Sequence, residues 1–216
     1  LGRVTRDIER KMPTGNEVLP GLLGLAHRVL AQERTSKNKV YSVHEPQVEC
    51  IAKGKAHQRY EFGNKAGLVT SARSNWILGA TGFTGIPYDG HTLQKNLTQA
   101  ERLSGIAINQ AACDLGYRGH GVVGKNILIV PRDKRGGTAV IKKWWRRRNA
   151  IEPIIGHEKS DHRLERNRLA GELGERMNVV LSACGFNFKK LWRAFCAWLR
   201  SQIQAMSGED LRLNFA

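Results

Sequence analysis

The sequence predicts an α/β fold, in which short strands alternate with helices. Apolar residues recur at helical spacing over residues 91–103, whereas residues 106–113 and 126–130 are apolar runs of strand length. Residues 60–71 and 76–80 are two further strand candidates with a short turn between them. Alternation of these two periodicities is typical of a mixed sheet with flanking helices. At 216 residues, the chain is long enough to bury such a core without disulfides.

The first part of the chain is predicted to be a helical arm or hairpin. Residues 1 to about 34 mix apolar and basic positions at helical spacing, with breaks around Pro13 to Asn16 and at Pro20 and Gly21. Residues 39–48 then alternate apolar and polar positions, and residues 53–59 are basic. The strands that follow, 60–71 and 76–80, are expected to be antiparallel neighbours.

The middle of the chain contains a predicted strand that is followed directly by an acidic residue. A turn region over residues 82–90 precedes the helix at 91–103. The apolar run at 106–113 is short enough to be a buried strand, and it delivers Asp114 at its end. Residues 126–130 form another short strand.

The last part of the chain is predicted to be helical. A basic turn over residues 132–137 leads into a long helix that begins at Thr138, and the apolar, aromatic residues 177–203 form one or two closing helices around Cys184, Gly185 and Phe186. We expect three regions: a helical arm or insertion remnant at 1–38, a core at 39–200 and a C-terminal tail at 201–216.

The composition points to a polyanionic partner. Lys and Arg number 35 against 19 Asp and Glu, so the formal charge is +16 and the pI is about 10.2. An anionic membrane is the competing partner, but no run approaches the roughly 20 apolar residues of a spanning helix, and no signal-peptide pattern opens the chain. We therefore expect a cytoplasmic protein. Its cysteines, Cys50, Cys113, Cys184 and Cys196, form no Cys-x-x-Cys pair, so reduced thiols are expected.

One predicted helical face combines a carboxylate with cations. At about 100° per residue, Trp145, Arg148, Glu152 and Lys159 fall within a narrow sector. A carboxylate among cations can hold a divalent metal while its neighbours hold phosphate oxygens, as metal-assisted phosphoryl transfer requires. The alternative is a solvated amphipathic helix with ion pairs along its surface.

A second candidate is the segment from Asp114 to His120, where a buried strand gives way to a glycine-rich, basic loop. A metal ligand is well placed there, and the alternative is an acidic residue that caps a turn. The neighbouring tryptophans Trp144 and Trp145, beside three arginines, suit stacking on unpaired bases, with ordinary core packing as the alternative.

Two other motifs lack the context that their chemistry needs. Residues 119–126 satisfy the dinucleotide pattern G-x-G-x-x-G, but a strand rather than a helix follows the glycines, which argues against an ATP or NAD site. His157 and His162 are five residues apart, so on a helix they point roughly 140° apart and cannot share a metal.

Taken together, these segments resemble the DDE transposases of bacterial insertion sequences, in the group with a Tyr-x2-Arg-x3-Glu-x6-Lys signature. Here the signature positions are Trp145, Arg148, Glu152 and Lys159, so Trp replaces Tyr and the phenolic hydroxyl is missing. The resemblance to one subgroup, insertion-sequence family five, covers most of the chain. It extends to residues 48–56, 60–63, 87–93, 114–120, 146–157 and 185–188.

The resemblance implies a ribonuclease H-like catalytic core, in which three acidic residues hold two Mg²⁺ (or Mn²⁺) ions for DNA strand cleavage and transfer. By position, Asp114 is the second acid and Glu152 the third. DNA contacts are expected from residues of both segments: Trp145, Arg148, Lys159, Arg118, His120, Arg146 and Arg147. The resemblance also implies that the partners are transposon ends and target DNA, that the chain forms a homo-oligomer on DNA, and that it is located at the bacterial nucleoid.

The first acid of the family has no counterpart here. Asp7 lies in a basic helical stretch, and Asp89 belongs to the Pro-Tyr-Asp-Gly-His segment, which the family has in addition to its three acids. We therefore expect a chain that begins after the first catalytic strand, so that the core is incomplete and the chain binds DNA without transposing it. A non-catalytic nucleic-acid binder and an inactive remnant of a mobile element are the alternatives.

Overall fold

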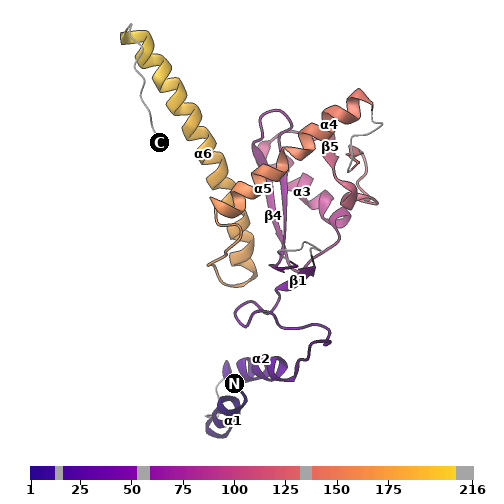
Figure 1. The fold of residues 1–216 in the computed structure, drawn as a ribbon, viewed down its shortest axis with the longest axis vertical. Helices are drawn as coiled ribbons and strands as arrows, with labels where there is room; N and C mark the ends of the chain where they lie inside the picture. Colours follow the sequence, from indigo (N-terminus) through magenta and orange to yellow (C-terminus); the bar gives the residue numbers. More distant parts are fainter. Residues whose placement is uncertain (13–16, 53–58, 132–137, 208–216) are drawn as a thin grey trace. The chain divides into compact units, whose positions relative to one another are not determined.

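The computed structural model describes residues 1–12, 17–52, 59–131 and 138–207, and the chain divides into two compact units (Figure 1). Unit 1 contains residues 1–65 and 83–86, and unit 2 contains residues 66–82 and 87–216. In these described segments, helices combine with three two-stranded sheets, which agrees with the predicted α/β class. Among the described residues, no helix has the length and apolar character needed to cross a bilayer.

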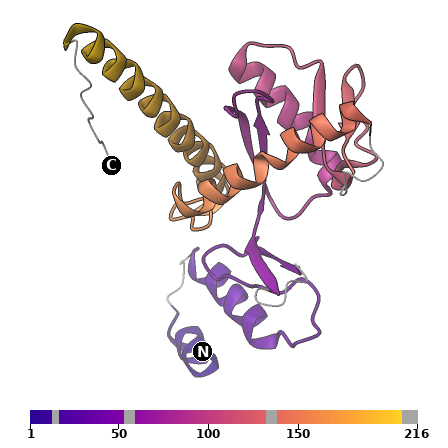
Figure 2. The ribbon, with the colours of Figure 1, turned by 45° about the horizontal axis from the view of Figure 1, so that its top comes forward.

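Unit 1 pairs two helices and contains a small sheet. Helices α1 (Gly2–Lys11) and α2 (Leu19–Ala31) lie together, with His27 Nε2 2.5 Å from Glu9 Oε1 (Figure 2). The predicted break at Pro20 and Gly21 is wrong, because Pro20 occupies the first turn of α2, where its missing N–H costs no helical hydrogen bond. The predicted break at 13–16 lies outside the described residues.

The sheet of unit 1 is formed by β1 (Glu49–Ala52) and β2 (Tyr60–Gly63), which are antiparallel with Glu49 opposite Gly63. The basic residues 53–58 that connect them lie outside the described residues. The predicted single strand at 60–71 is in fact two strands. Gly63 has a φ of 146°, a conformation open to glycine, and it turns the chain between β2 and the next strand.

The next two strands, β3 (Lys65–Thr70) and β4 (Ile77–Phe83), form the predicted hairpin. Its turn is closed by the hydrogen bond from the Ser71 N–H to the Trp76 carbonyl (2.8 Å). At the other end the Lys65 N–H donates to the Gly85 carbonyl (3.0 Å), so the two strands are antiparallel, as predicted.

The hairpin lies between helices on both faces. In one cluster, Ile77 and Ala80 pack with α5 (Ile151–Ser160) and α6 (Gly171–Ser207), and Leu68 of β3 joins them. In a second cluster, its neighbour Val69 packs with Leu93 and Leu97 of α3 (Asp89–Ser104). Consecutive strand residues point to opposite faces, which explains how one short strand serves two clusters.

Close contact between α3 and the hairpin depends on glycines. A Cβ at Gly79 would stand 3.0 Å from Cβ of Ala100 and 3.1 Å from its Cα. Gln99 adds polar contacts, since its Oε1 accepts from the Ala80 N–H (2.8 Å) and its Nε2 donates to the Ala80 carbonyl (3.0 Å). Asn187 of α6 makes the same two bonds to the backbone of Ile77. These amides satisfy strand backbone groups that would otherwise need another strand.

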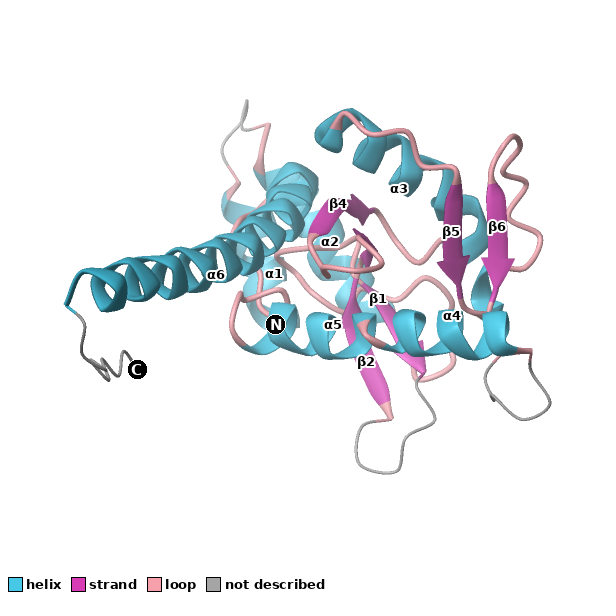
Figure 3. Ribbon diagram, turned by 90° about the horizontal axis from the view of Figure 1, so that it is seen from above, coloured by secondary structure: helices cyan, strands magenta, loops and turns pink. Residues whose placement is uncertain are grey.

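Strands β5 (Gln110–Cys113) and β6 (Asn126–Ile129) are parallel, with Gln110 opposite Asn126 and Cys113 opposite Ile129 (Figure 3). Their connection, residues 114–125, contains the 3₁₀ helix η1 (Leu115–Tyr117) and three glycines with positive φ. The predicted strand at 106–113 is shorter than expected, because α3 ends at Gly105 in the left-handed conformation and the exposed Ile106 lies in a loop.

The predicted long helix from Thr138 is two helices, α4 (Ala139–Asn149) and α5, which meet at Ala150. Thr138 caps α4, since its hydroxyl accepts from the Ile141 N–H (3.4 Å). Pro153 lacks the N–H that would bond to the Asn149 carbonyl, which accounts for the interruption. The predicted basic turn at 132–137 lies outside the described residues.

The closing segment is one helix, α6, of 37 residues. Its first half packs against β4 and α5, while most side chains beyond residue 190 are exposed. The exposed half carries a row of aromatic rings, Trp192, Phe195 and Trp198, with successive centroids 5.9 Å apart. Figures 1 and 2 show this half extending away from the rest of unit 2.

A carboxyl group is buried between α5 and α6. Glu158 has no exposed surface, and its Oε2 accepts a hydrogen bond from the Ser182 hydroxyl. Its Oε1 has no hydrogen-bond partner among the described residues. Burial therefore raises the pKa of Glu158 above its usual value, and the bond from Ser182 only partly opposes this.

Replacing Gly79 should loosen α3 from the hairpin. We expect Gly79→Ala to destabilise the chain by about 1–2 kcal/mol, because the new methyl group would meet the backbone of Ala100. Gly156→Ala is the matched control, since a Cβ there meets nothing within 4 Å in a helix interior, and it should be neutral or stabilising by up to about 1 kcal/mol. Urea denaturation measures both, and equal effects would contradict this packing.

Replacing Glu158 should change how stability depends on pH. The folded-state pKa lies above the unfolded value of about 4.5, so the folded chain binds more protons and loses stability as pH rises above that value. We expect Glu158→Gln to raise Tm at pH 8 much more than at pH 5, because glutamine keeps the acceptor for Ser182 without a charge. Glu165→Gln, on the surface, should show no such difference. A constant difference between wild type and Glu158→Gln across pH would contradict a buried titrating carboxyl.

Candidate active site

Asp114 directly follows β5, as the sequence predicts, and its side chain has two roles. Its Oδ1 accepts a hydrogen bond from the Gly116 N–H (3.0 Å) and so caps η1. Its Oδ2 accepts from Nη2 of Arg148 (3.1 Å). The turn-capping role and the position at a polar site are therefore compatible.

Arg148 joins the two acidic residues that the sequence singled out. Its Nη2 reaches Asp114 while its Nη1 donates to Oε1 of Glu152 (2.7 Å) and to Oδ1 of Asn149 (3.1 Å). The pair with Glu152 keeps the i,i+4 spacing even though α4 ends at Asn149. The structure thus brings Asp114 and Glu152 to one guanidinium, from the end of a strand and the start of a helix.

The ion pairs of Arg148 contribute little to stability. The side chains of Arg148, Asp114 and Glu152 are 26%, 43% and 62% exposed. Ion pairs with this much solvent access are typically worth about 0–1 kcal/mol. Their effect is to hold two carboxylates at one place on the surface.

A third carboxylate, from Asp89, lies beside Asp114. A Cβ on Gly116 would stand 2.6 Å from Oδ2 of Asp89 and 3.1 Å from Oδ1 of Asp114, so the missing side chain of Gly116 makes room for both. Sequence reasoning set Asp89 apart from the acidic residues, and no spacing rule connects the two segments. The Pro-Tyr-Asp-Gly-His segment was the available signal.

Two neighbours of Asp114 are neutral at physiological pH. Burial, reinforced by the charge of Asp114, raises the pKa of the Cys113 thiol to about 12. Burial also raises the pKa of the Tyr117 phenol to about 12, with smaller contributions from the charges of Asp89 and Asp114. A thiol and a phenol in this state are not nucleophiles, so the ionisable chemistry of this surface resides in its carboxylates.

The other predicted residues of α4 and α5 lie in different surroundings. Arg146 and Lys159 are exposed, and Trp145 is half-buried. Arg147 donates to the backbone carbonyl of Ala72 in the β3–β4 turn, so it ties α4 to the hairpin.

The loop after Asp114 is held by its own contacts. The Arg118 side chain is exposed, while its backbone carbonyl accepts from the Tyr88 hydroxyl (2.6 Å). Nδ1 of His120 accepts from the Val122 N–H (3.0 Å), which leaves Nε2 as the protonated nitrogen of a neutral ring.

The glycine motif at residues 119–126 and the pair His157 and His162 make contacts within the fold. Strand β6 begins at Asn126 directly after Gly124 and Lys125, so no helix N-terminus follows the glycines. Nζ of Lys125 instead bonds to Oε1 of Glu101 (2.5 Å) and lowers the pKa of that carboxyl. His157 Nδ1 lies 3.0 Å from Oδ2 of Asp161, whereas the ring of His162 packs against Phe186.

The carboxylates suit a divalent metal in ligand type, since Mg²⁺ prefers carboxylate oxygens. In the part of the chain that the structure describes, no three His, Cys, Asp or Glu side chains gather as a metal-binding group. One oxygen of Asp114 and one of Glu152 instead face the guanidinium of Arg148.

Residues 125–192 match the family model described as transposase DDE domain. The match includes Trp145, Arg148, Glu152 and Lys159, and it begins after Asp114. It covers less than a third of the chain. No curated protein and no solved structure matches the chain. The family match supports a DDE transposase.

Proposed function

We propose that the chain acts in metal-dependent cleavage and transfer of DNA strands, with Asp114 and Glu152 as metal ligands. The observation that carries this proposal is the Arg148 guanidinium, which contacts both carboxylates. Glu152 and Arg148 lie within the matched DDE segment, and Asp114 comes from the end of a strand outside it. A shared metal site requires that the carboxylates of Asp114 and Glu152 come together from these two parts of the chain.

We also propose that unit 2 has a ribonuclease H-like core with one strand position open. Val69 of β3 and Ala111 of β5 pack in the same cluster against α3. Among the described residues, however, β3 pairs only with β4, and β5 only with β6. A further strand between β3 and β5 would join the two pairs into one mixed sheet, and it is the place for the first acid that the resemblance implies.

The residues around the pair would bind and orient DNA. Mg²⁺ or Mn²⁺ held by Asp114 and Glu152 would supply Lewis-acid stabilisation of charge at the reacting phosphate. The exposed cations Arg146, Lys159 and Arg118 are candidates for contacts to phosphate oxygens, and Trp145 and His120 lie in the same segments. Membership of insertion-sequence family five, a homo-oligomer on DNA and location at the nucleoid are parts of this proposal.

A non-catalytic DNA-binding protein is the second candidate. It is favoured by the lack, in the described residues, of a third ligand in metal-binding geometry. A charge of +16 gives such a protein strong, salt-dependent affinity for DNA without any metal.

Metal binding separates the two candidates. We expect Asp114→Asn and Glu152→Gln each to weaken Mn²⁺ binding by about tenfold or more, because each removes a direct ligand, and even the loss of outer-shell partners typically costs 10–100-fold. Electron paramagnetic resonance of free Mn²⁺ measures this directly. Glu165→Gln, an exposed carboxyl outside the site, is the control. Wild-type affinity in both site variants would contradict the proposed ligands.

Removing Arg148 should change metal and DNA binding in opposite directions. We expect Arg148→Gln to tighten Mn²⁺ binding, since a competing positive charge leaves the two carboxylates, and to weaken DNA binding at the same time. Titrations with Mn²⁺ and with a labelled duplex measure the two effects. Unchanged Mn²⁺ affinity would favour the non-catalytic candidate.

Strand cleavage tests the function itself. With two carboxylates in place of three, we expect at most weak nicking of supercoiled plasmid in Mn²⁺, and complete loss of that nicking in Asp114→Asn and in Glu152→Gln. Agarose gels of plasmid incubated with the full chain provide the measurement. Nicking that persists in both variants would show that other residues are responsible.

A further inference from the structure

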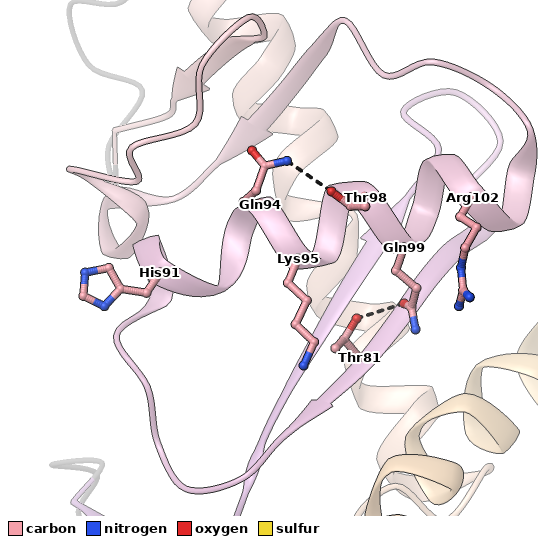
Figure 4. Close-up of a pocket in the computed structure, with 7 residues that line it drawn as sticks. All are labelled: Thr81, His91, Gln94, Lys95, Thr98, Gln99 and Arg102. Carbon is pink, nitrogen blue, oxygen red and sulfur yellow. Dashed lines mark hydrogen bonds between the residues drawn. The ribbon is translucent and has the colours of Figure 1, made fainter.

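An open groove lies along α3, and none of the residues assigned to the proposed reaction lines it. Its volume is about 500 Å³. It is lined by six residues of α3 and one of β4: His91, Gln94, Lys95, Thr98, Gln99, Arg102 and Thr81. Figure 4 shows the six side chains of α3 along the helix and Thr81 on the neighbouring strand. We call this surface the α3 groove.

Three basic side chains form a row on the α3 groove. At about 100° per residue, His91, Lys95 and Arg102 fall within a sector of roughly 40°. All three are exposed, on the side of α3 opposite to the buried Leu93 and Leu97. At about 1.5 Å per residue, the row is about 16 Å long.

The floor of the groove is fixed by internal hydrogen bonds. Oε1 of Gln99 accepts from the Thr81 hydroxyl (2.9 Å) and from the backbone of Ala80, so these groups are already satisfied. Nε2 of Gln94 donates to the Thr98 hydroxyl (3.1 Å) along the rim. The row of basic side chains therefore stands on a support that internal hydrogen bonds hold in place.

The groove is electropositive. None of the seven described residues that line it is acidic. The nearby carboxyl of Glu101 is paired with Lys125 on another side of the helix. Basic side chains together with hydroxyl and amide groups are the residue types that contact nucleic-acid phosphates.

The groove begins beside the candidate active site. Asp89, in the first turn of α3, lies against Gly116 next to Asp114. The Tyr88 hydroxyl bonds to the Arg118 carbonyl and ties the start of α3 to the loop after Asp114. A polyanion on the groove would therefore reach the Asp114 loop at the His91 end.

We propose that the α3 groove binds the phosphate backbone of duplex DNA next to the Asp114 and Glu152 pair. A duplex presents regularly repeated phosphates along each strand, so a row of about 16 Å is long enough to meet more than one of them. This length suits a regular backbone rather than a single phosphate group. This inference deepens the proposed function and rests on it only in taking DNA as the substrate.

Salt dependence of DNA binding tests the α3 groove. For the double variant Lys95→Gln/Arg102→Gln in the full chain, we expect the slope of log K against log salt to become shallower by about 1.8, since each lost phosphate contact removes about 0.9. Affinity at fixed salt should fall equally for unrelated duplex sequences. Fluorescence anisotropy of a labelled duplex at several NaCl concentrations gives both quantities.

The matched control is Arg166→Gln/Arg168→Gln, which removes two exposed charges from the loop between α5 and α6. The inference would be overturned if the salt slope changed no more in the groove variant than in this control. Thr98→Glu is a second variant, which places a carboxylate within the row and should weaken binding further at unchanged Tm. Wild-type affinity in this variant would also overturn it.

The two proposals fail in different ways. In one outcome, plasmid nicking depends on Asp114 and Glu152, but the groove variant keeps the wild-type salt slope. This result would support the proposed function and contradict DNA binding by the α3 groove. In the other outcome, the groove variant has a shallower salt slope, but the chain neither binds Mn²⁺ through Asp114 and Glu152 nor nicks DNA. This result would support DNA binding by the α3 groove and contradict the proposed function.

Discussion

The double contact of Arg148 with Asp114 and Glu152 is the interaction on which the candidate site depends. It connects a loop that leaves a parallel strand pair with the junction of two helices, which belong to distant parts of the chain. Because the ion pairs are partly solvated, they add little to the free energy of folding. Their importance is geometric, since they bring two carboxylates to the same cation.

The rest of unit 2 makes this convergence possible by fixing three elements on one hairpin. Helix α3 lies close to β4 because Gly79 carries no side chain, while α5 and α6 cover the other face through Ile154, Val179 and Ala183. Arg147 then ties α4 to the hairpin turn. The basic run of α4 therefore combines a structural contact with side chains that face solvent.

Local patterns were sufficient to predict most elements and the placement of Asp114 after its strand. The spacing predicted a shared helical face for Arg148 and Glu152, with surface ion pairs as the alternative to a metal site, and an ion pair between the two is present across the break between α4 and α5. The break itself follows from Pro153, which the helical periodicity concealed. Proximity of Asp89 to Asp114 and the use of Gln99 as a backbone partner were not predictable, because they depend on tertiary packing between segments without a common spacing.

The twelve-residue connection between β5 and β6 has a consequence for how the site can change. Parallel strands need about a dozen residues to return to the same end of the sheet, so residues 114–125 are close to the shortest chain that can make the crossing. Asp114 opens this connection, and the glycines at 119, 121 and 124 supply its left-handed turns. A deletion there would shift the strand register and displace the carboxylate in the same step. Deletions in this loop should therefore be tolerated less than in ordinary surface loops, even where no substrate is touched.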